Sequence, residues 1–187
     1  MKILKLFVVS LGLAGTLVAG PMGPLTPSPL PLVALGGPVV VYWAGSSAAF
    51  QSQFFLVQPT TVGPFFNNSS STIGDSLTLG SFSTGTVLKF ELDVLTTGNQ
   101  FFTGPASGNP DGIVHAAYAG WAADTTIAVN GVLVGFEDVF NAGPGILDYD
   151  DNKFVITGAI PAPEPASWML IACGLGAAAG FSRRYRR

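Results

Sequence analysis

Thr86-Val-Leu-Lys-Phe-Glu-Leu-Asp-Val94 is the stretch of this 187-residue chain that decides the fold class. Every second side chain from position 88 onward is apolar: Leu88, Phe90, Leu92 and Val94. The residues between them are the charged Lys89, Glu91 and Asp93. A period of two is typical of a β-strand that has one face against a core and the other in water. The stretch therefore predicts a half-buried strand.

Further short apolar runs lie on both sides of this stretch, separated by Gly, Pro, Asn and Ser. We expect strands at residues 39–43, 54–57 and 76–82. Between its two ends the chain has no convincing period of about 3.6 residues, which an amphipathic helix would show. Many short strands with frequent turn signals predict an all-β fold, either an antiparallel β-sandwich or a jelly roll.

The dipeptide Asn130-Gly131 lies between alternating apolar residues in the segment 125–136. Asn-Gly favours the positive φ angles of a two-residue hairpin loop, so the segment predicts a tight hairpin. Continuing that register places Asp124 opposite Glu137. Like charges that face each other across two strands are destabilising. We therefore expect that the strands have separated at this point or that a cation lies between the two acids.

Acidic residues are concentrated just after this segment: Glu137, Asp138, Asp148, Asp150 and Asp151. The loop 141–145 is rich enough in Gly to fold back and bring the first two acids toward the others. Ca²⁺ takes about six to eight oxygen ligands, often from flexible loops. These acids predict a Ca²⁺ site, with Asp124 as a further candidate ligand, although the spacing of an EF-hand loop is absent. The alternative is that they are solvated surface charges.

The N-terminal end has the pattern of a secretory signal peptide. Lys2 and Lys5 precede an apolar run that extends to Ala19, which predicts a signal peptide helix at 1–19. The prolines of the next segment, 20–38, remove backbone donors and favour extended geometry. We expect this segment to be a linker or arm whose leucines lie against the domain, and the β-domain to occupy 39–160.

The C-terminal segment, 161–187, combines three features. It contains Pro163-Glu164-Pro165, then an apolar run at 168–181, and then an arginine cluster: Arg183, Arg184, Arg186 and Arg187. Short positive flanks stay on the cytoplasmic side of a membrane, so the run predicts a transmembrane helix. The order of these features resembles the PEP-CTERM sorting signal of Gram-negative bacteria, in which an exosortase is thought to cut near the Pro-Glu-Pro. An ordinary single-span anchor is the alternative.

This resemblance implies a route and a destination. The chain would pass through the Sec translocon, stay in the inner membrane through its C-terminal helix before processing, and reach the cell surface or extracellular matrix.

The segment between the two ends is strongly acidic. It contains two basic residues, Lys89 and Lys153, and ten of the eleven acidic residues of the chain. Such a composition excludes nucleic acid as a partner, because phosphates require Lys and Arg.

The composition also argues against an enzyme. His115 is the only histidine, and its apolar surroundings indicate a packing role. No G-x-S-x-G nucleophile motif is present. The only cysteine, Cys173, lies in the C-terminal segment, so the domain has no disulfide and no thiol nucleophile.

A second resemblance covers residues 85–158. Gly135-Phe-Glu-Asp138 and Asp148-Tyr-Asp-Asp151, together with Asn109-Pro-Asp-Gly112 and His115-Ala116 upstream, resemble a bacterial family of unknown function. Its members are surface or secreted β-sandwich domains, and their acids are suspected to bind cations. The resemblances imply a non-catalytic structural or binding component linked to exopolysaccharide or biofilm. A Ca²⁺-dependent carbohydrate-binding or carbohydrate-active protein is the alternative.

Overall fold

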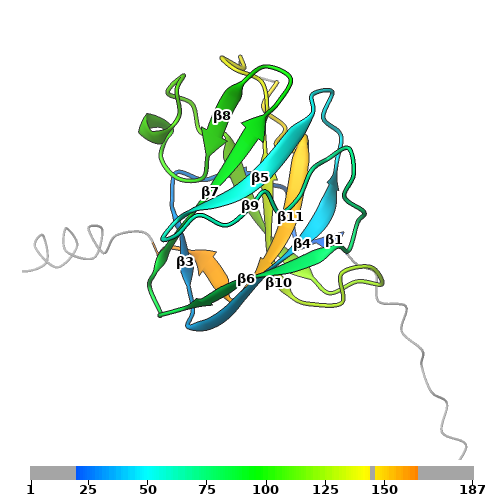
Figure 1. The fold of residues 1–187 in the computed structure, drawn as a ribbon, viewed down its shortest axis with the longest axis vertical. Coiled ribbons are helices and arrows are strands. Elements are labelled where there is room, and N and C mark those ends of the chain that lie inside the picture. Colours follow the sequence, from blue (N-terminus) through cyan, green and yellow to red (C-terminus); the bar gives the residue numbers. More distant parts are fainter. Residues whose placement is uncertain (1–19, 144–145, 164–187) are drawn as a thin grey trace, which may run out of the picture.

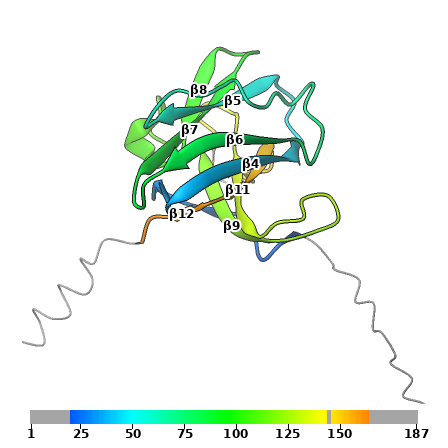
Figure 2. The same cartoon turned by 60° about the horizontal axis from the view of Figure 1, so that its bottom comes forward.

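The computed structural model describes residues 20–143 and 146–163. These residues form two antiparallel sheets packed against each other as a sandwich (Figure 1, Figure 2). The predictions of an all-β fold and of a sandwich are confirmed. The predicted signal peptide helix at 1–19 and the apolar run at 168–181 lie outside the described residues. Among the described residues, no helix has the length and apolar character needed to cross a membrane.

The larger sheet has seven strands in the order β1-β9-β10-β11-β4-β6, and β2 also pairs with β9. Their bounds are β1 Gly20–Pro21, β2 Thr26–Pro27, β4 Gly37–Ser46, β6 Ser76–Phe82, β9 Ala116–Ala122, β10 Gly131–Phe136 and β11 Asn152–Thr157. The smaller sheet has five strands in the order β12-β3-β7-β5, and β8 also pairs with β7. Their bounds are β3 Leu32–Ala34, β5 Ser52–Gln58, β7 Val87–Val94, β8 Asn99–Phe102 and β12 Ala159–Pro161. A short 3₁₀ helix, η1, spans Ala106–Gly108.

Strand β7 has the burial that its sequence predicts. The even-numbered side chains are all fully buried: Leu88, Phe90, Leu92 and Val94. The strand pairs with β5 along one edge and with β3 and β8 along the other. Its central place in the smaller sheet explains why its alternation is the clearest in the chain. The strands expected at 39–43, 54–57 and 76–82 are also present, as parts of β4, β5 and β6.

Aromatic side chains join the two sheets. Phe54 of β5 lies 5.1 Å from Phe154 of β11 and 5.4 Å from Phe136 of β10, measured between ring centroids. Phe90 of β7 lies 5.1 Å from Phe154. Edge-to-face aromatic pairs contribute about 0.5–1.5 kcal/mol each beyond their area burial. The core is therefore densest where β5 and β7 face β10 and β11.

The segment 20–38 is not a linker, contrary to the expectation from its prolines. Leu32 and Ala34 are buried in the core, and β3 pairs with both β7 and β12. Proline keeps a chain extended, and it is tolerated at strand ends and sheet edges. The alternating Leu-Val-Ala run of β3 therefore still forms a strand. Residues 20–38 therefore belong to the described part of the sandwich, and at its other end the N–H of Ala162 donates to the carbonyl of Pro31.

The hairpin expected at Asn130-Gly131 is also absent, so that prediction is wrong. Strand β10 pairs with β9 instead, with Gly131 opposite Trp121. Residues 123–130 form a loop in which the Asn130 side chain accepts a hydrogen bond from the N–H of Ala123 at 2.9 Å. Asn and Asp side chains compete with regular pairing through such local bonds. The apolar Ile127 of this loop is buried on the outer face of the larger sheet.

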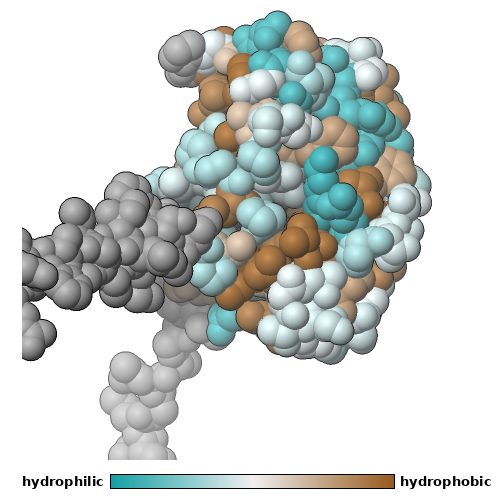
Figure 3. All heavy atoms as spheres, turned by 90° about the vertical axis from the view of Figure 1, so that its left-hand side faces the viewer, coloured by the Kyte–Doolittle hydropathy of each residue, from teal (hydrophilic) through white to brown (hydrophobic). Residues whose placement is uncertain are grey.

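The outer face of the smaller sheet is apolar where β12, β3 and the start of β7 lie side by side. Viewed from the side on which β3 and β12 lie, apolar side chains gather in a band across the lower part of the molecule (Figure 3). Val33 pairs in register with Ile160 on one side and with Val87 on the other. Ile160 and Val87 are exposed. This apolar row adjoins the point at which the chain passes from β12 toward Pro163.

Candidate metal centre

The loop 137–151 connects two neighbouring strands, and this connection gathers the acids. Phe136, the last residue of β10, pairs with Asn152, the first residue of β11. Glu137 and Asp138 therefore start the loop beside Asp151, which ends it. The sequence correctly predicted this fold-back. The acids do not lie on strands, because Asn141 and Tyr149 have positive φ angles of 55° and 59° and turn the chain.

A glycine allows the loop to pack closely on β10. A Cβ atom at Gly135 would overlap the carbonyl oxygen of Tyr149 and the side chain of Leu25. The hydroxyl of Tyr149 donates to the carbonyl of Val114 at 3.1 Å, which fixes the second half of the loop. Any other residue at Gly135 would push this half away and separate the acids.

Three carboxylates, two of them buried and that of Asp151 half-buried, form a group that we call the inner group: Glu137, Asp138 and Asp151. Their candidate ligand oxygens all lie within 4.8 Å of one another. Glu137 and Asp138 are each only 2% exposed. The Oε2 atom of Glu137 and the Oδ2 atom of Asp138 have no hydrogen-bond partner in the described part of the chain. Buried charges without partners are strongly unfavourable, so this group requires protons or a cation.

The pKa values of the inner group express the same requirement. Burial, together with the neighbouring Asp151 carboxylate, raises the pKa of Glu137 to about 7. Burial and Asp151 likewise raise the pKa of Asp138 to about 7. A divalent cation bound between these oxygens would remove the repulsion that the protons otherwise relieve.

Asn152, the first residue of β11, is a further buried polar residue at the end of the loop. It follows Asp151 directly and is fully buried. Neither its amide oxygen nor its amide nitrogen has a hydrogen-bond partner among the described residues. Amide oxygens are ordinary Ca²⁺ ligands. Glu137, Asp138 and Asn152 thus each have a buried oxygen that the described residues leave without a hydrogen-bond partner.

A second group, the outer group, shares Asp151 and is more accessible. It consists of Asp148, Asp150 and Asp151, again with candidate ligand oxygens within 4.8 Å of one another. The hydroxyl of Ser47 donates to the carbonyl oxygen of Asp150 at 2.8 Å, which ties the loop to the end of β4. The five acids named from the sequence are therefore brought together, in two groups that overlap at one residue.

The structure does not bring Asp124 to these acids. Asp124 follows β9 at its end near Trp121, whereas Glu137 lies at the other end, where Phe136 pairs with Ala116. At about 3.3 Å per residue, the length of β9 separates them by roughly 20 Å. The Asp124 carboxylate instead accepts a hydrogen bond from the N–H of Thr126 at 2.7 Å within its own loop.

His115 holds the start of the acidic loop through its hydrogen bonds. It is fully buried and stacks on Phe101 with 3.7 Å between ring centroids. Its Nε2 atom lies 2.9 Å from Asp111 Oδ2 and its Nδ1 atom 2.9 Å from the carbonyl oxygen of Glu137. Asp111 also accepts from the N–H of Asn141 at 2.9 Å. The Asp111–His115 pair therefore anchors the first half of the loop.

The Asp111 pKa reflects these bonds. Burial alone would raise it, but hydrogen bonds from the N–H of Asn141 and from His115 bring it below the usual range. The ionised carboxylate is thus the form that holds the loop. The sequence indicated a packing role for His115, but it did not indicate that Asp111 would bond to it. The only available signal was the i, i+4 spacing of the two residues.

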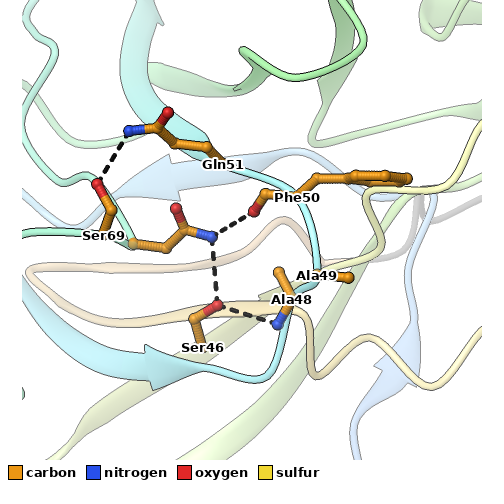
Figure 4. Close-up of a pocket in the computed structure, with 7 residues that line it drawn as sticks. Ser46, Ala48, Ala49, Phe50, Gln51 and Ser69 are labelled. Carbon is orange, nitrogen blue, oxygen red and sulfur yellow. Dashed lines mark hydrogen bonds between the residues drawn. The ribbon is translucent and has the colours of Figure 1, made fainter.

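A polar depression of about 460 Å³ lies beside the β4–β5 connection (Figure 4). Its polar groups are bonded to one another. The side-chain amide of Asn68 donates to the carbonyl of Phe50 at 2.7 Å, and that of Gln51 donates to the hydroxyl of Ser69 at 2.9 Å. These bonds join the β4–β5 connection to the loop that carries Asn68 and Ser69.

Of the predicted sorting residues, the structure describes Pro163. Glu164, Pro165 and the arginines at 183, 184, 186 and 187 lie outside the described residues. Pro163 directly follows Ala162, which is hydrogen-bonded to the domain. The sorting interpretation of this segment therefore stays a prediction from the sequence.

Comparisons with protein-family models, with curated proteins and with solved structures find no match to this chain. The two resemblances noted in the sequence receive no support from them and stay predictions. What the domain does has to be inferred from its own residues, above all from the two acidic groups of the loop 137–151.

Proposed function

We propose that the chain is an exported β-sandwich protein that binds Ca²⁺ in the loop 137–151. It would serve as a non-catalytic structural or binding component of the cell surface or extracellular matrix, linked to exopolysaccharide. One observation supports the Ca²⁺ part most strongly. Glu137 and Asp138 converge with Asp151 although both are buried and each has an oxygen without a hydrogen-bond partner.

The donor set suits Ca²⁺ better than a transition metal. It offers carboxylate oxygens from a loop, without sulfur or imidazole, as hard cations prefer. The ion pair found among the described residues joins His115 to Asp111. No Lys or Arg of that part of the chain therefore forms an ion pair with the acidic groups, and a bound cation would supply the missing charge.

The export part of the proposal is supported by the sequence. The signal-peptide pattern at 1–19 and the PEP-CTERM resemblance of 161–187 favour passage through the Sec translocon and processing by an exosortase. Before processing, the apolar run at 168–181 would hold the chain in the inner membrane. The scarcity of basic residues between the two ends supports a partner other than nucleic acid.

A non-catalytic role agrees with the surroundings of the only histidine. His115 is fully buried, stacked on Phe101, and bonded through both ring nitrogens. A general base has to reach its substrate within hydrogen-bond distance, and a ring held in this way is out of reach. The proposal therefore assigns His115 a positioning role for the acidic loop.

A thermal melt tests the Ca²⁺ part of the proposal. The fragment should span residues 20–163, because a fragment that begins at residue 39 lacks the buried Leu32 and Ala34 of β3. Ca²⁺ at about 100 times its Kd stabilises a fold by about 2.7 kcal/mol. For a domain of this size the midpoint should rise by several degrees relative to chelator.

Matched variants localise the effect. Asp151→Asn should abolish the shift, because Asp151 belongs to both groups. Asp124→Asn makes the same charge change far from the loop and should leave the shift intact. A fragment whose midpoint is the same in millimolar Ca²⁺ and in chelator would refute the proposed Ca²⁺ site.

A further inference from the structure

The outer face of the larger sheet carries a cavity of about 370 Å³ beside the acidic loop. Trp121 of β9, Leu133 of β10 and Leu25 of the N-terminal segment line it, and Leu25 packs against the cluster that contains the other two. Asp148, Asp150 and Lys153 complete its lining. Ligand sites typically have volumes of about 300–1,000 Å³, with apolar walls and a few polar groups. The cavity has this composition.

Two of the lining residues also belong to the outer group. The candidate ligand oxygens of Asp148, Asp150 and Asp151 lie within 4.8 Å of one another, and the first two residues face the cavity. A Ca²⁺ ion at the outer group would therefore lie at the edge of the cavity. Three carboxylates do not fill the roughly six to eight positions of Ca²⁺, so positions would remain for oxygens of a ligand.

Trp121 provides an independent indication of a ligand. Its side chain is only 8% exposed, and its Nε1 atom is buried without a hydrogen-bond partner among the described residues. A buried indole N–H usually finds an acceptor, and leaving one unpaired costs about 1–3 kcal/mol. Trp121 itself lines the cavity, and a ligand oxygen that reached this N–H would satisfy it. The Lys153 ammonium adds a second kind of donor at the same cavity.

We propose that this cavity binds a saccharide, with vicinal hydroxyl groups on a Ca²⁺ ion held by Asp148, Asp150 and Asp151. This inference rests on the proposed function and names the ligand class of the same loop. A pyranose ring has an apolar face, which suits Trp121 and Leu133. Its hydroxyl groups donate and accept, which suits the carboxylates and Lys153 together.

Other ligand classes fit the cavity less well. An acyl chain would fill the apolar part but leave Asp148 and Asp150 against apolar surface, which is costly for charged groups. A polyanion without hydroxyl groups would bind the cation but would not use the apolar floor. The mixture of apolar lining, acceptors and donors favours a ring that carries several hydroxyl groups.

The test is a glycan array of neutral and uronic-acid oligosaccharides. It is probed with the full chain in a zwitterionic, sugar-free detergent, in millimolar Ca²⁺ and in chelator. Titration calorimetry then measures the Kd of an oligosaccharide that binds. We expect binding in Ca²⁺ and at least tenfold weaker binding in chelator. An array without any bound oligosaccharide in Ca²⁺, or binding that is equal in chelator, would overturn the inference.

Variants show whether binding occurs in this cavity. Lys153→Met should weaken it about tenfold, whereas Lys89→Met, the matched change on β7, should leave it unchanged. Trp121→Phe keeps an aromatic ring but removes the N–H, and we expect a loss of about fivefold. Equal affinities for Lys153→Met and the unchanged chain would place the saccharide elsewhere and contradict the inference.

The two proposals fail in different ways. A Ca²⁺-dependent rise of the melting midpoint without any glycan binding would refute the saccharide site and leave the cation site standing. The absence of any Ca²⁺ effect on the midpoint would refute both. Each variant is first checked for an unchanged melting midpoint in chelator, and Lys153, which is only half-buried, is suited to substitution without unfolding.

Discussion

Strand β7 and the loop 137–151 both carry acidic residues, but they place them differently. In β7, Glu91 and Asp93 lie on the half-exposed face, and Asp93 accepts a hydrogen bond from the Gln53 side chain at 3.0 Å. In the loop, Glu137 and Asp138 are each 2% exposed, and each has an oxygen without a partner. Burial and the neighbouring Asp93 raise the pKa of Glu91 as well, but the acids of the strand face keep access to water, whereas the buried acids of the loop need a counter-charge.

The two regions should differ in whether the effect of a substitution depends on Ca²⁺. β7 contributes stability by burying apolar side chains, which requires no ion. The loop contributes stability only when something neutralises its carboxylates. Substitutions in β7 should therefore lower stability equally with and without Ca²⁺, and substitutions in the loop should change the response to Ca²⁺ itself.

The largest effect is expected from Phe90→Ala in β7. Phe90 is fully buried between the sheets and lies 5.1 Å from Phe154. Truncation of a buried Phe to Ala typically costs about 3–5 kcal/mol. Urea unfolding should show this loss equally in Ca²⁺ and in chelator. A loss below about 1 kcal/mol would contradict the assignment of β7 to the centre of the core.

The next effect is the loss of Ca²⁺ stabilisation in Glu137→Gln. We expect the rise in the free energy of unfolding, about 2.7 kcal/mol at 100 times the Kd, to fall by more than half. The matched change Glu91→Gln in β7 should keep the full rise. Urea unfolding of both variants with and without Ca²⁺ provides the measurement. An equal Ca²⁺ response in the two variants would remove the distinction between the regions.

In chelator, the stability of the fold should fall as the pH rises. The pKa values of Glu137 and Asp138 are raised to about 7, so between about pH 4 and pH 7 the folded chain binds more protons than the unfolded chain. The stability that these two groups contribute is therefore fully present below about pH 4, and it is lost as the pH rises through about 7. The melting midpoint in chelator should fall by a few degrees between pH 5 and pH 8.

The double variant Glu137→Gln, Asp138→Asn serves as the control for this effect. It removes both raised carboxyls, so its midpoint should change less over the same pH range. Excess Ca²⁺ should also abolish the fall in the unchanged chain, because the cation favours the ionised carboxylates. A midpoint that falls equally in the double variant would assign the effect to other groups.

The smallest effect is expected from Gln53→Ala on β5. It removes the hydrogen bond to Asp93 on the half-exposed face of the smaller sheet. Cross-strand polar pairs contribute roughly 0.2–1 kcal/mol. The loss should be the same with and without Ca²⁺ in urea unfolding. A loss of several kcal/mol would mean that the acids of β7 also depend on specific partners.

The sequence predicted those elements whose pattern is local. The alternation from Leu88 to Val94 predicted β7 because a half-buried strand has a period of two. The hairpin at Asn130-Gly131 was predicted incorrectly, because side chains of the loop 123–130 bond to their own backbone and β10 finds a longer partner in β9. The segment 20–38 was misjudged because prolines obscured the short strand β3.

The sequence predicted which acids form the candidate site, but it did not predict that two of them are buried. The spacing of the acids and the Gly-rich loop indicated that the two ends of the loop would meet. Nothing in the local pattern showed that the pairing of Phe136 with Asn152 would bury Glu137 and Asp138. The bonds of Asp111 to His115 and to Asn141 join distant segments, and only the fold shows them.

Proton release on Ca²⁺ binding tests the central claim most directly. The chain is titrated with Ca²⁺ by calorimetry at pH 6.5 in two buffers of different ionisation enthalpy. If Ca²⁺ binds at the inner group, it displaces protons from Glu137 and Asp138, because both pKa values are about 7. The observed heat should then depend on the buffer, and the double variant Glu137→Gln, Asp138→Asn should lose that dependence. No binding heat, or a heat that is the same in both buffers, would contradict a cation site built on these buried acids.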